Sequence, residues 1–521
     1  MLRADYYSAP TELDLVVFEK LIPAQHYLRR LKAAINFEPC RALVADGYAA
    51  GMGAPATDPV CLLKLSLLQF QYDLSDSQVL RHAQVNVAFR FFLDLSLESP
   101  LPVPSLLSQF RTRLGVERFT RLFNEILRQA RAQGLVKDRL RLKDATHLIA
   151  NIALPSALRL VAQTREQVLA AAECFAPGEV TAQREQATAI RAATAELKEE
   201  QRLLARVTPL RELVAWGEQW PPRLRAAAES QLPLVSAEQE AAFGEALALA
   251  HKVLNDREPQ ATDKLLSLVD RDARMGRHGE FYDGYLLDVS LDADSERICA
   301  LDVLPANGDE GANAKALILS EEHAQGNDIG SLSIDRIGCR GDVLAELSDD
   351  VDGPQLTVYV PPIAWTPPGA ELFQSTAFTL NDAGTEVRCP GGATTRTRMR
   401  AKRGYGWQFR FRATQCHSCP LRAQCLRPTT RGGRTVIKND YEAQYQAAQQ
   451  RAQTEAYRAG RREHPRIERK LAELMRWHAG RRVRYRGRLR VKLQYLLTAV
   501  VVNCKRIVQL LAAPLQPLAR L

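Results

Sequence analysis

Three acidic residues on separate segments of the chain have the types and surroundings that could bind divalent cations. Asp144 falls on the apolar side of the alternating stretch 140–148, where a carboxylate is costly without a partner. Asp335 ends the short apolar segment 331–335, a position where α/β folds place ligand groups. Glu468 is the only acid on the apolar side of a helical wheel drawn over 466–478. Each acid alone is also compatible with a turn or an ion pair. Together they favour phosphoryl chemistry with two Mg²⁺ ions held by carboxylate oxygens.

Four of the ten cysteines lie close together in the sequence: Cys389, Cys416, Cys419 and Cys425. A Cys-x2-Cys pair with two further cysteines nearby is typical of a structural Zn²⁺ site. His417 is a substitute ligand, and the alternative interpretation is four reduced cysteines in a loop. The other six cysteines are expected to be small buried hydrophobic residues.

The net charge of +10 hides an asymmetry between two parts of the chain. Residues 381–521 contain 31 Lys and Arg against 8 Asp and Glu, whereas the remainder contains 39 against 52. A basic C-terminal quarter on an acidic body predicts a surface that binds a polyanion, most often nucleic acid. The alternative is a basic tail that serves solubility. The basic residues expected to contact DNA phosphates after residue 480 are Arg481, Arg482, Arg484, Arg486, Arg488 and Lys492.

Hydrophobic periodicity divides the chain into six segments. We expect a helical N-terminal domain for DNA binding (1–135), a first core strand with Asp144 (136–160) and a helical insertion (161–263). These are followed by a strand-rich core with Asp335 (264–362), a Cys-rich, zinc-binding insertion (363–440) and basic C-terminal helices with Glu468 (441–521). Within these segments we expect a helix start at Ser75, one continuous helical arm over 181–207, a turn at 221–222 and a strand hairpin over 282–304.

The N-terminal residues contain no apolar run typical of a signal peptide. The apolar run 495–502 is too short to span a membrane. The sequence therefore predicts a cytoplasmic protein with no membrane partner.

Several blocks of sequence resemble bacterial insertion-sequence transposases of the DDE class, in the branch whose catalytic core is RNase H-like. The cysteine cluster is similar to one seen in this branch. The likeness covers most of the chain and is least diagnostic over 160–263. The blocks are Lys143-Asp-Ala-Thr-His-Leu-Ile-Ala-Asn151, 277–288, 304–310, 333–335, Arg466-Ile-Glu-Arg-Lys-Leu-Ala-Glu-Leu-Met-Arg476, 484–498 and 503–506.

The resemblance implies a mixed α+β or α/β fold: an RNase H-like mixed sheet with helices, a helical N-terminal domain, a helical insertion and a Cys-rich insertion. Asp144, Asp335 and Glu468 are then the first, second and third catalytic acids, holding two Mg²⁺ or Mn²⁺ ions. The implied activity is metal-dependent DNA strand cleavage and strand transfer. The implied partners are the terminal inverted repeats and target double-stranded DNA, bound by a homodimer. The implied location is the bacterial cytoplasm, at the nucleoid.

The chain departs from the Tyr, Arg, Glu, Lys signature that related transposases often carry around the third acid. Arg461 and His464 precede Glu468 by seven and four residues, and Arg476 or Lys470 stands in for the missing Lys. We assign Arg461, His464 and Arg476 to the DNA-binding set. Arg336 follows Asp335 where the family often has Gly. These departures keep two alternatives open: a catalytically inactive, transposase-derived DNA-binding protein, and an RNase H-like nuclease or resolvase that does not join DNA.

Overall fold

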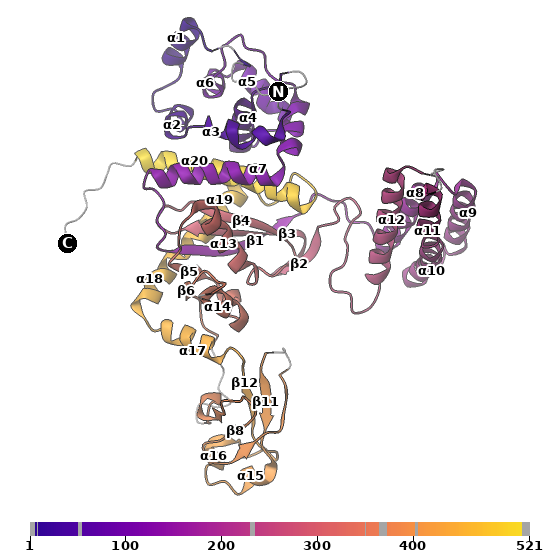
Figure 1. Cartoon of the computed structure of the whole chain (residues 1–521), viewed down its shortest axis with the longest axis vertical. Helices are drawn as coiled ribbons and strands as arrows, with labels where there is room; N and C mark the ends of the chain where they lie inside the picture. The colour runs from indigo at the N-terminus through magenta and orange to yellow at the C-terminus, as the bar shows by residue number, and fades with distance from the viewer. Residues whose placement is uncertain are drawn as a thin grey trace, which may run out of the picture.

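The computed structural model describes residues 6–7, 9–49, 55–229, 235–349, 351–363, 372–401 and 405–512; the end of the expected segment 441–521 lies outside them. The described residues form a mixed sheet with helices packed against it, a helical N-terminal unit, a helical side unit and a Cys-rich unit (Figure 1). The structure is therefore of mixed helix and sheet class, as the sequence predicted.

The N-terminal unit is helical. The helix expected from Ser75 is α5, and its capping box has Gln78 N donating to Ser75 Oγ and Ser75 N donating to the Gln78 side chain. Helix α4 is buried on nearly all sides because it contacts its neighbours in this unit and α20. The helices are α1 (Glu12–Leu21), α2 (Tyr27–Ala34), α3 (Pro39–Leu43), α4 (Pro59–Gln71), α5 (Asp76–Val85), α6 (Val87–Leu93) and α7 (Pro104–Ala132).

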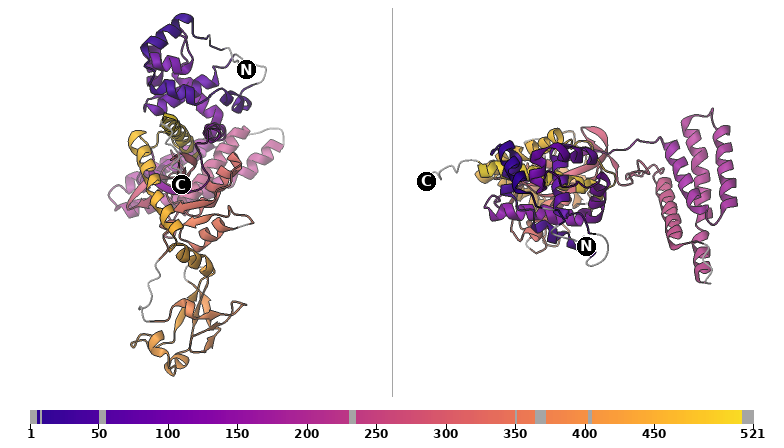
Figure 2. Two further views of the ribbon diagram at one scale, coloured as in Figure 1. Left: turned by 90° about the vertical axis from the view of Figure 1, so that its left-hand side faces the viewer. Right: turned by 90° about the horizontal axis from the view of Figure 1, so that it is seen from above.

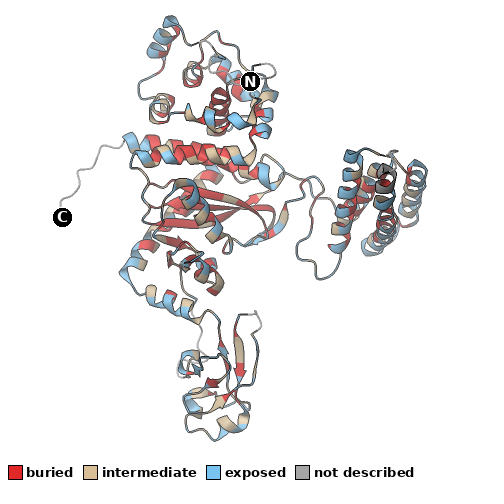
Figure 3. Cartoon of the chain, viewed as in Figure 1, coloured by how far each residue is buried: buried red, intermediate tan, exposed pale blue. Residues whose placement is uncertain are grey.

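Two long helices separate this unit from the sheet. Helices α7 and α20 (Arg488–Ala512) lie side by side, with buried residues along both (Figure 3). Helix α20 runs well beyond the apolar run 495–502. Among the described residues it is the one helix long and apolar enough to cross a membrane, but 67% of its apolar window is buried inside the protein. It is therefore the central helix of the hydrophobic core.

The sheet combines antiparallel and parallel pairing. Strand β1 (Arg141–Ile149) is the strand expected from the alternating stretch, and it lies between β3 (Glu280–Asp292) and β5 (Ser331–Ile334). Strands β2 (Arg274–His278) and β4 (Ile298–Pro305) both pair with β3, so the expected hairpin over 282–304 is confirmed. Strand β6 (Thr357–Tyr359) extends the parallel side. Helices α13 (Asn313–Gln325) and α14 (Gly341–Ser348) join the strands that flank them in sequence, and α17 (Glu442–Arg451), α18 (Glu455–Glu463) and α19 (Pro465–Trp477) precede α20.

The helical insertion stands away from the body (Figure 2) and has its own hydrophobic core. It comprises α8 (Ala157–Ala172), α9 (Pro177–Ala193), α10 (Glu199–Gly217), α11 (Trp220–Glu229) and α12 (Ala237–Asn255). The single arm expected over 181–207 is wrong, because α9 ends at Ala193 and α10 starts at Glu199. The turn expected at 221–222 is also wrong. Both prolines lie in the first turn of α11, where a missing N–H costs nothing.

The Cys-rich unit contains strands that the sequence did not reveal. Among its described residues are two three-stranded sheets, β7-β8-β9 and β10-β11-β12. Strands of two to four residues are too short to produce a visible period. The elements are β7 (Thr379–Leu380), β8 (Val387–Arg388), β9 (Thr394–Thr395), β10 (Arg398–Arg400), β11 (Trp407–Arg410), β12 (Thr435–Lys438), α15 (Ala413–His417) and α16 (Arg422–Cys425).

Candidate active site

Strand pairing brings Asp144 and Asp335 to the same edge of the sheet. Strands β1 and β5 run parallel, with Leu142 opposite Ser333 and Lys143 opposite Ile334. The next residue on each strand is one of the two acids. Because paired strands lie about 4.8 Å apart, Asp144, within β1, and Asp335, directly after β5, have neighbouring backbone positions. Asp335 then starts a short 3₁₀ turn, and its Oδ1 accepts a hydrogen bond from Ile337 N at 3.1 Å.

The junction of α18 and α19 is tied to β5 one turn before Glu468. Arg461 Nη1 donates to Ser333 Oγ at 3.1 Å and to the Ile334 carbonyl at 2.8 Å. His464 Nδ1 lies 3.2 Å from the same Ser333 hydroxyl. Helix α19 then packs across β1. These contacts place Glu468, in the first turn of α19, on the same side as the two aspartates.

The Glu468 side chain is exposed, which corrects the burial expected from the helical wheel. The buried face of α19 consists of Ile467, Lys470, Leu471 and Leu474. Lys470 is buried although the wheel placed it on the polar side. Its aliphatic stem packs inward while its Nζ pairs with Glu473 at 2.7 Å. Glu468 therefore lies at the rim of the buried face and is accessible from solvent.

Negative charge is concentrated at the edge of the sheet where Asp144 and Asp335 lie. Burial raises the pKa of Asp144 to about 7, and the Asp335 and Glu468 carboxyl groups raise it as well. A hydrogen bond from Ala145 N at 2.9 Å and the charge of Lys143 act in the opposite direction. Burial lowers the pKa of Arg461, while Asp335, Glu468 and Asp144 are among the acids that raise it. The three acids and Arg461 thus form one electrostatic group.

The donor chemistry of this group fits a divalent cation. Carboxylate oxygens are the ligands that Mg²⁺ prefers, and the raised pKa of Asp144 shows that its negative charge is under-compensated. Within the described ranges, however, no three or more His, Cys, Asp or Glu side chains are arranged as a metal-ligand group. A cation would therefore have to draw these side chains together.

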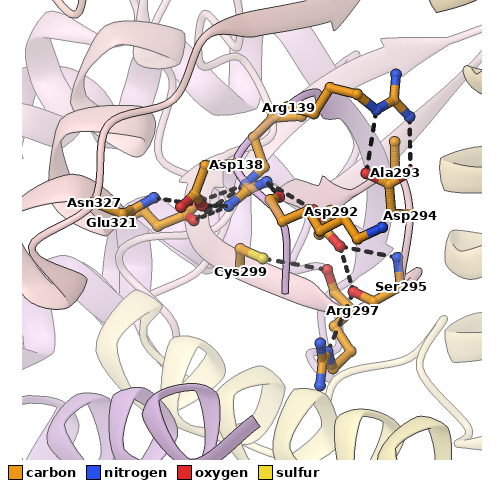
Figure 4. Close-up of polar contacts among 12 residues, drawn as sticks. Asp138, Arg139, Asp292, Ala293, Asp294, Ser295, Arg297, Cys299, Glu321 and Asn327 are labelled. Carbon is orange, nitrogen blue, oxygen red and sulfur yellow. Dashed lines mark hydrogen bonds and ion pairs between the residues drawn. The ribbon is translucent and has the colours of Figure 1, made fainter. Parts of the chain in front are cut away.

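A buried ion-pair network holds the other face of β1 (Figure 4). Arg141 is fully buried, and its guanidinium donates to Asp292 Oδ1 at 2.8 Å and to Glu321 Oε1 at 2.7 Å, both on buried carboxylates. Lys143 pairs with buried Asp288 at 2.8 Å. Because side chains alternate along a strand, these cations face α13 while Asp144 faces the opposite side. The network fixes the strand that carries the first acid.

The structure separates the predicted DNA-binding residues into two groups. His464 is buried, and burial lowers its pKa to about 4, so it is not a surface contact. Arg461 is committed to Ser333 and Ile334. Four others also make internal contacts: Arg481 with Thr146 and the His147 carbonyl, Arg484 with Asp73 and the Leu74 carbonyl, Arg486 with the Asn151 carbonyl, and Lys492 with Asp302. The exposed residues are Arg476, Arg482, Arg486 and Arg488.

The four clustered cysteines line one pocket of the Cys-rich unit. Cys389, Cys416 and Cys419 each raise the pKa of the Cys425 thiol, after burial as the main cause. A Cβ on Gly391 would lie 2.9 Å from Cys419 Sγ, so only glycine fits beside this thiol. His417 Nε2 lies 3.2 Å from the Arg431 carbonyl.

Sequence reasoning missed Glu310, which lies at the same edge of the sheet. Burial raises its pKa to about 7, Lys143 lowers it, and Asp335, Asp288 and Asp144 raise it. Glu310 precedes α13 in a loop without periodicity. The only available signal was its place in one of the blocks that resemble transposases.

Two family models match the chain. One is described as a transposase domain (DUF772) and matches residues 16–113, within the N-terminal helices. The other is described as a transposase DDE domain and matches residues 388–508, which include Glu468. No curated protein and no solved structure matches. Both models belong to transposases, as the sequence blocks implied. The two matches support the interpretation of the chain as an insertion-sequence transposase of the DDE class.

Proposed function

We propose that this transposase cuts DNA at the ends of its element and joins the cut ends to target DNA. In the first step a water oxygen attacks the phosphodiester, and the 3′ O–P bond breaks to leave a 3′-hydroxyl and a 5′-phosphate. In the second step this 3′-hydroxyl attacks a target phosphodiester and displaces another 3′ oxygen. The observation that carries the proposal is the convergence of Asp144, Asp335 and Glu468 at one edge of the sheet.

The chain supplies the positions of the acids and the surrounding charge. Asp144, Asp335 and Glu468 would hold two Mg²⁺ or Mn²⁺ ions, which supply Lewis-acid chemistry and lower the pKa of bound water. Arg461, on the helix before the one that carries Glu468, is hydrogen-bonded to the strand that Asp335 follows. The antiparallel strands β4, β3 and β1, continued by parallel β5 and β6, support an RNase H-like core.

The exposed arginines of the C-terminal segment provide a surface for DNA phosphates. Arg482 and Arg486 belong to the connection between α19 and α20, and this connection pairs with the end of β1 at Ile149. DNA held there would run beside the acids. We assign recognition of the terminal inverted repeats to the N-terminal helices. Bringing two ends together favours a homodimer on DNA, in the cytoplasm at the nucleoid.

We also propose that Cys389, Cys416, Cys419 and Cys425 hold a structural Zn²⁺. Their convergence on one pocket supports this assignment, and thiolates suit tetrahedral Zn²⁺. The unit has a small hydrophobic core around Phe378 and Phe409. A bound metal would therefore add to its stability.

The decisive experiment incubates purified protein with DNA that carries the flanking repeats and with target plasmid, with and without Mg²⁺ or Mn²⁺. We expect cleavage at the repeat ends and joined products, both lost in Glu468→Gln and without metal. Glu455→Gln is the matched control, because Glu455 is an exposed acid of the preceding helix that pairs with Arg458 and Arg462. It should keep wild-type activity.

Two other outcomes identify the alternatives. Cleavage without joined products would indicate a nuclease or resolvase. Binding of the repeats without cleavage in either metal would indicate an inactive DNA-binding remnant, in which Arg336, exposed beside Asp335, disturbs the site.

A further inference from the structure

We propose that Glu310 is a fourth carboxylate of the cation site, in addition to Asp144, Asp335 and Glu468. The inference rests on the proposed function of those three residues. Glu310 lies in the loop between β4 and α13, which is distant in sequence from all of them. Its place at the site comes from contacts that hold this loop on both sides.

The first contact ties the loop to β1. Lys143, the residue before Asp144, donates from Nζ to the Glu310 carbonyl at 2.8 Å. The same Nζ pairs with buried Asp288 on β3 at 2.8 Å. Because Lys143 is itself buried, this bridge fixes the Glu310 backbone beside the strand that carries the first acid.

The second contact ties the loop to the segment after Asp335. Asp309 pairs with Arg340, which also pairs with Asp342 at the start of α14. A Cβ on Gly311 would lie 3.4 Å from the Ile337 carbonyl, so the loop backbone passes close to the turn that Asp335 starts. The loop that carries Glu310 is therefore held both to the strand of Asp144 and to the turn that follows Asp335.

The Glu310 carboxylate is not needed for these contacts. Across the described part of the chain it accepts no hydrogen bond and forms no ion pair, and the anchoring atom is its backbone oxygen. The side chain is half-buried rather than directed into open solvent. Burial is the main cause that raises the pKa of its carboxyl; Lys143 lowers this pKa, and Asp335, Asp288 and Asp144 raise it. A half-buried, unpaired carboxylate among other acids is suited to a cation.

The test measures cation binding directly, without DNA and without turnover. Mn²⁺ is titrated into the full-length protein and followed by calorimetry and by the electron paramagnetic resonance signal of free Mn²⁺. Losing an outer-shell partner of a metal ligand typically lowers metal affinity about 10- to 100-fold, and losing a carboxylate ligand should cost at least as much. We expect Glu310→Gln to raise the Mn²⁺ Kd at least about tenfold, while Glu346→Gln, which removes an exposed acid on α14, leaves it unchanged.

The Glu468→Gln variant distinguishes a failure of the proposed role of Glu310 from a failure of the proposed three-acid cation site. If Glu468→Gln weakens Mn²⁺ binding and Glu310→Gln stays within twofold of wild type, the role of Glu310 is refuted while the three-acid site stands. If neither variant changes Mn²⁺ binding, the proposed cation site itself is refuted. If Glu310→Gln folds poorly, Glu310→Ala is measured instead, because it removes the carboxylate without adding an amide. An unchanged Mn²⁺ Kd for Glu310→Ala also refutes the role of Glu310 as a cation ligand.

Discussion

Replacing Asp144 by Asn should stabilise the core while abolishing the proposed chemistry. Asp144 carries its charge in a largely buried position next to two other acids, and these surroundings raise its pKa from 3.8 to about 7. Asn has nearly the same shape and no charge. The variant therefore removes the electrostatic cost and keeps the packing.

The sign and size of the effect follow from the two pKa values. The unfolded chain loses the Asp144 proton near pH 3.8, whereas the folded chain keeps it up to about pH 7. Between these values the unfolded state binds fewer protons, so the stability of wild type falls as pH rises. At 1.36 kcal/mol per pKa unit, the total is about 4 kcal/mol. We expect Asp144→Asn to match wild type near pH 4 and to exceed it by up to about 4 kcal/mol at pH 8.

The measurement must report on the core, because a chain with several units does not unfold in one step. Hydrogen exchange of the amides of β1 and β3, compared between variant and wild type at each pH, gives this local stability. Adding Mg²⁺ to wild type should reduce the difference at pH 8, because a bound cation offsets the charge. Equal or lower protection of the variant at pH 8 would refute the assignment of a buried, under-compensated charge to Asp144.

Three further predictions concern the surroundings of the site. Arg141→Met leaves two buried carboxylates without their cation and should lower the stability of the core, measured by hydrogen exchange of β1 and β3, by about 3–5 kcal/mol; a loss below about 1 kcal/mol would contradict the role of the network. Cys416→Ser should lower the zinc content of purified protein, measured by mass spectrometry, whereas Cys174→Ser, at an exposed cysteine of the insertion, should not; equal zinc in both would rule out the cysteine site. Arg482→Ala should weaken DNA binding about equally for all sequences and reduce the slope of log affinity against log salt by about one, and an unchanged slope would exclude a phosphate contact.

The sequence was sufficient where a residue's neighbours along the chain determine its surroundings. Alternation predicted the strand around Asp144, and the capping residues around Ser75 predicted the start of α5. The hairpin before α13 was found because its turn residues lie between two strands of visible period. These features depend on segments that are adjacent in the sequence.

Tertiary packing decided what the sequence could not. The wheel placed Glu468 on a buried face, but the orientation of α19 depends on how Arg461 and His464 contact β5, more than a hundred residues away in sequence. His464 was read as a DNA contact because its environment could not be known. Glu310 was missed for the same reason, since contacts with Lys143 and Arg340, both distant in sequence, hold its loop near the acids.

Strand β1 shows why residue type alone could not separate structural from functional charges. Arg141 and Lys143 face α13, where buried carboxylates pair with both of them. Asp144, one position further on, faces the other side and has no basic residue of its own. Successive residues of a strand point to opposite faces. The charges of Arg141 and Lys143, which are paired and stabilise the strand, therefore lie next to the under-compensated charge of Asp144, which can bind a cation. Since Lys143 also holds the Glu310 backbone, losing its amine should disturb the ion pair with Asp288 and the Glu310 loop at once, whereas losing the Asp144 carboxylate should abolish the chemistry and leave these contacts in place.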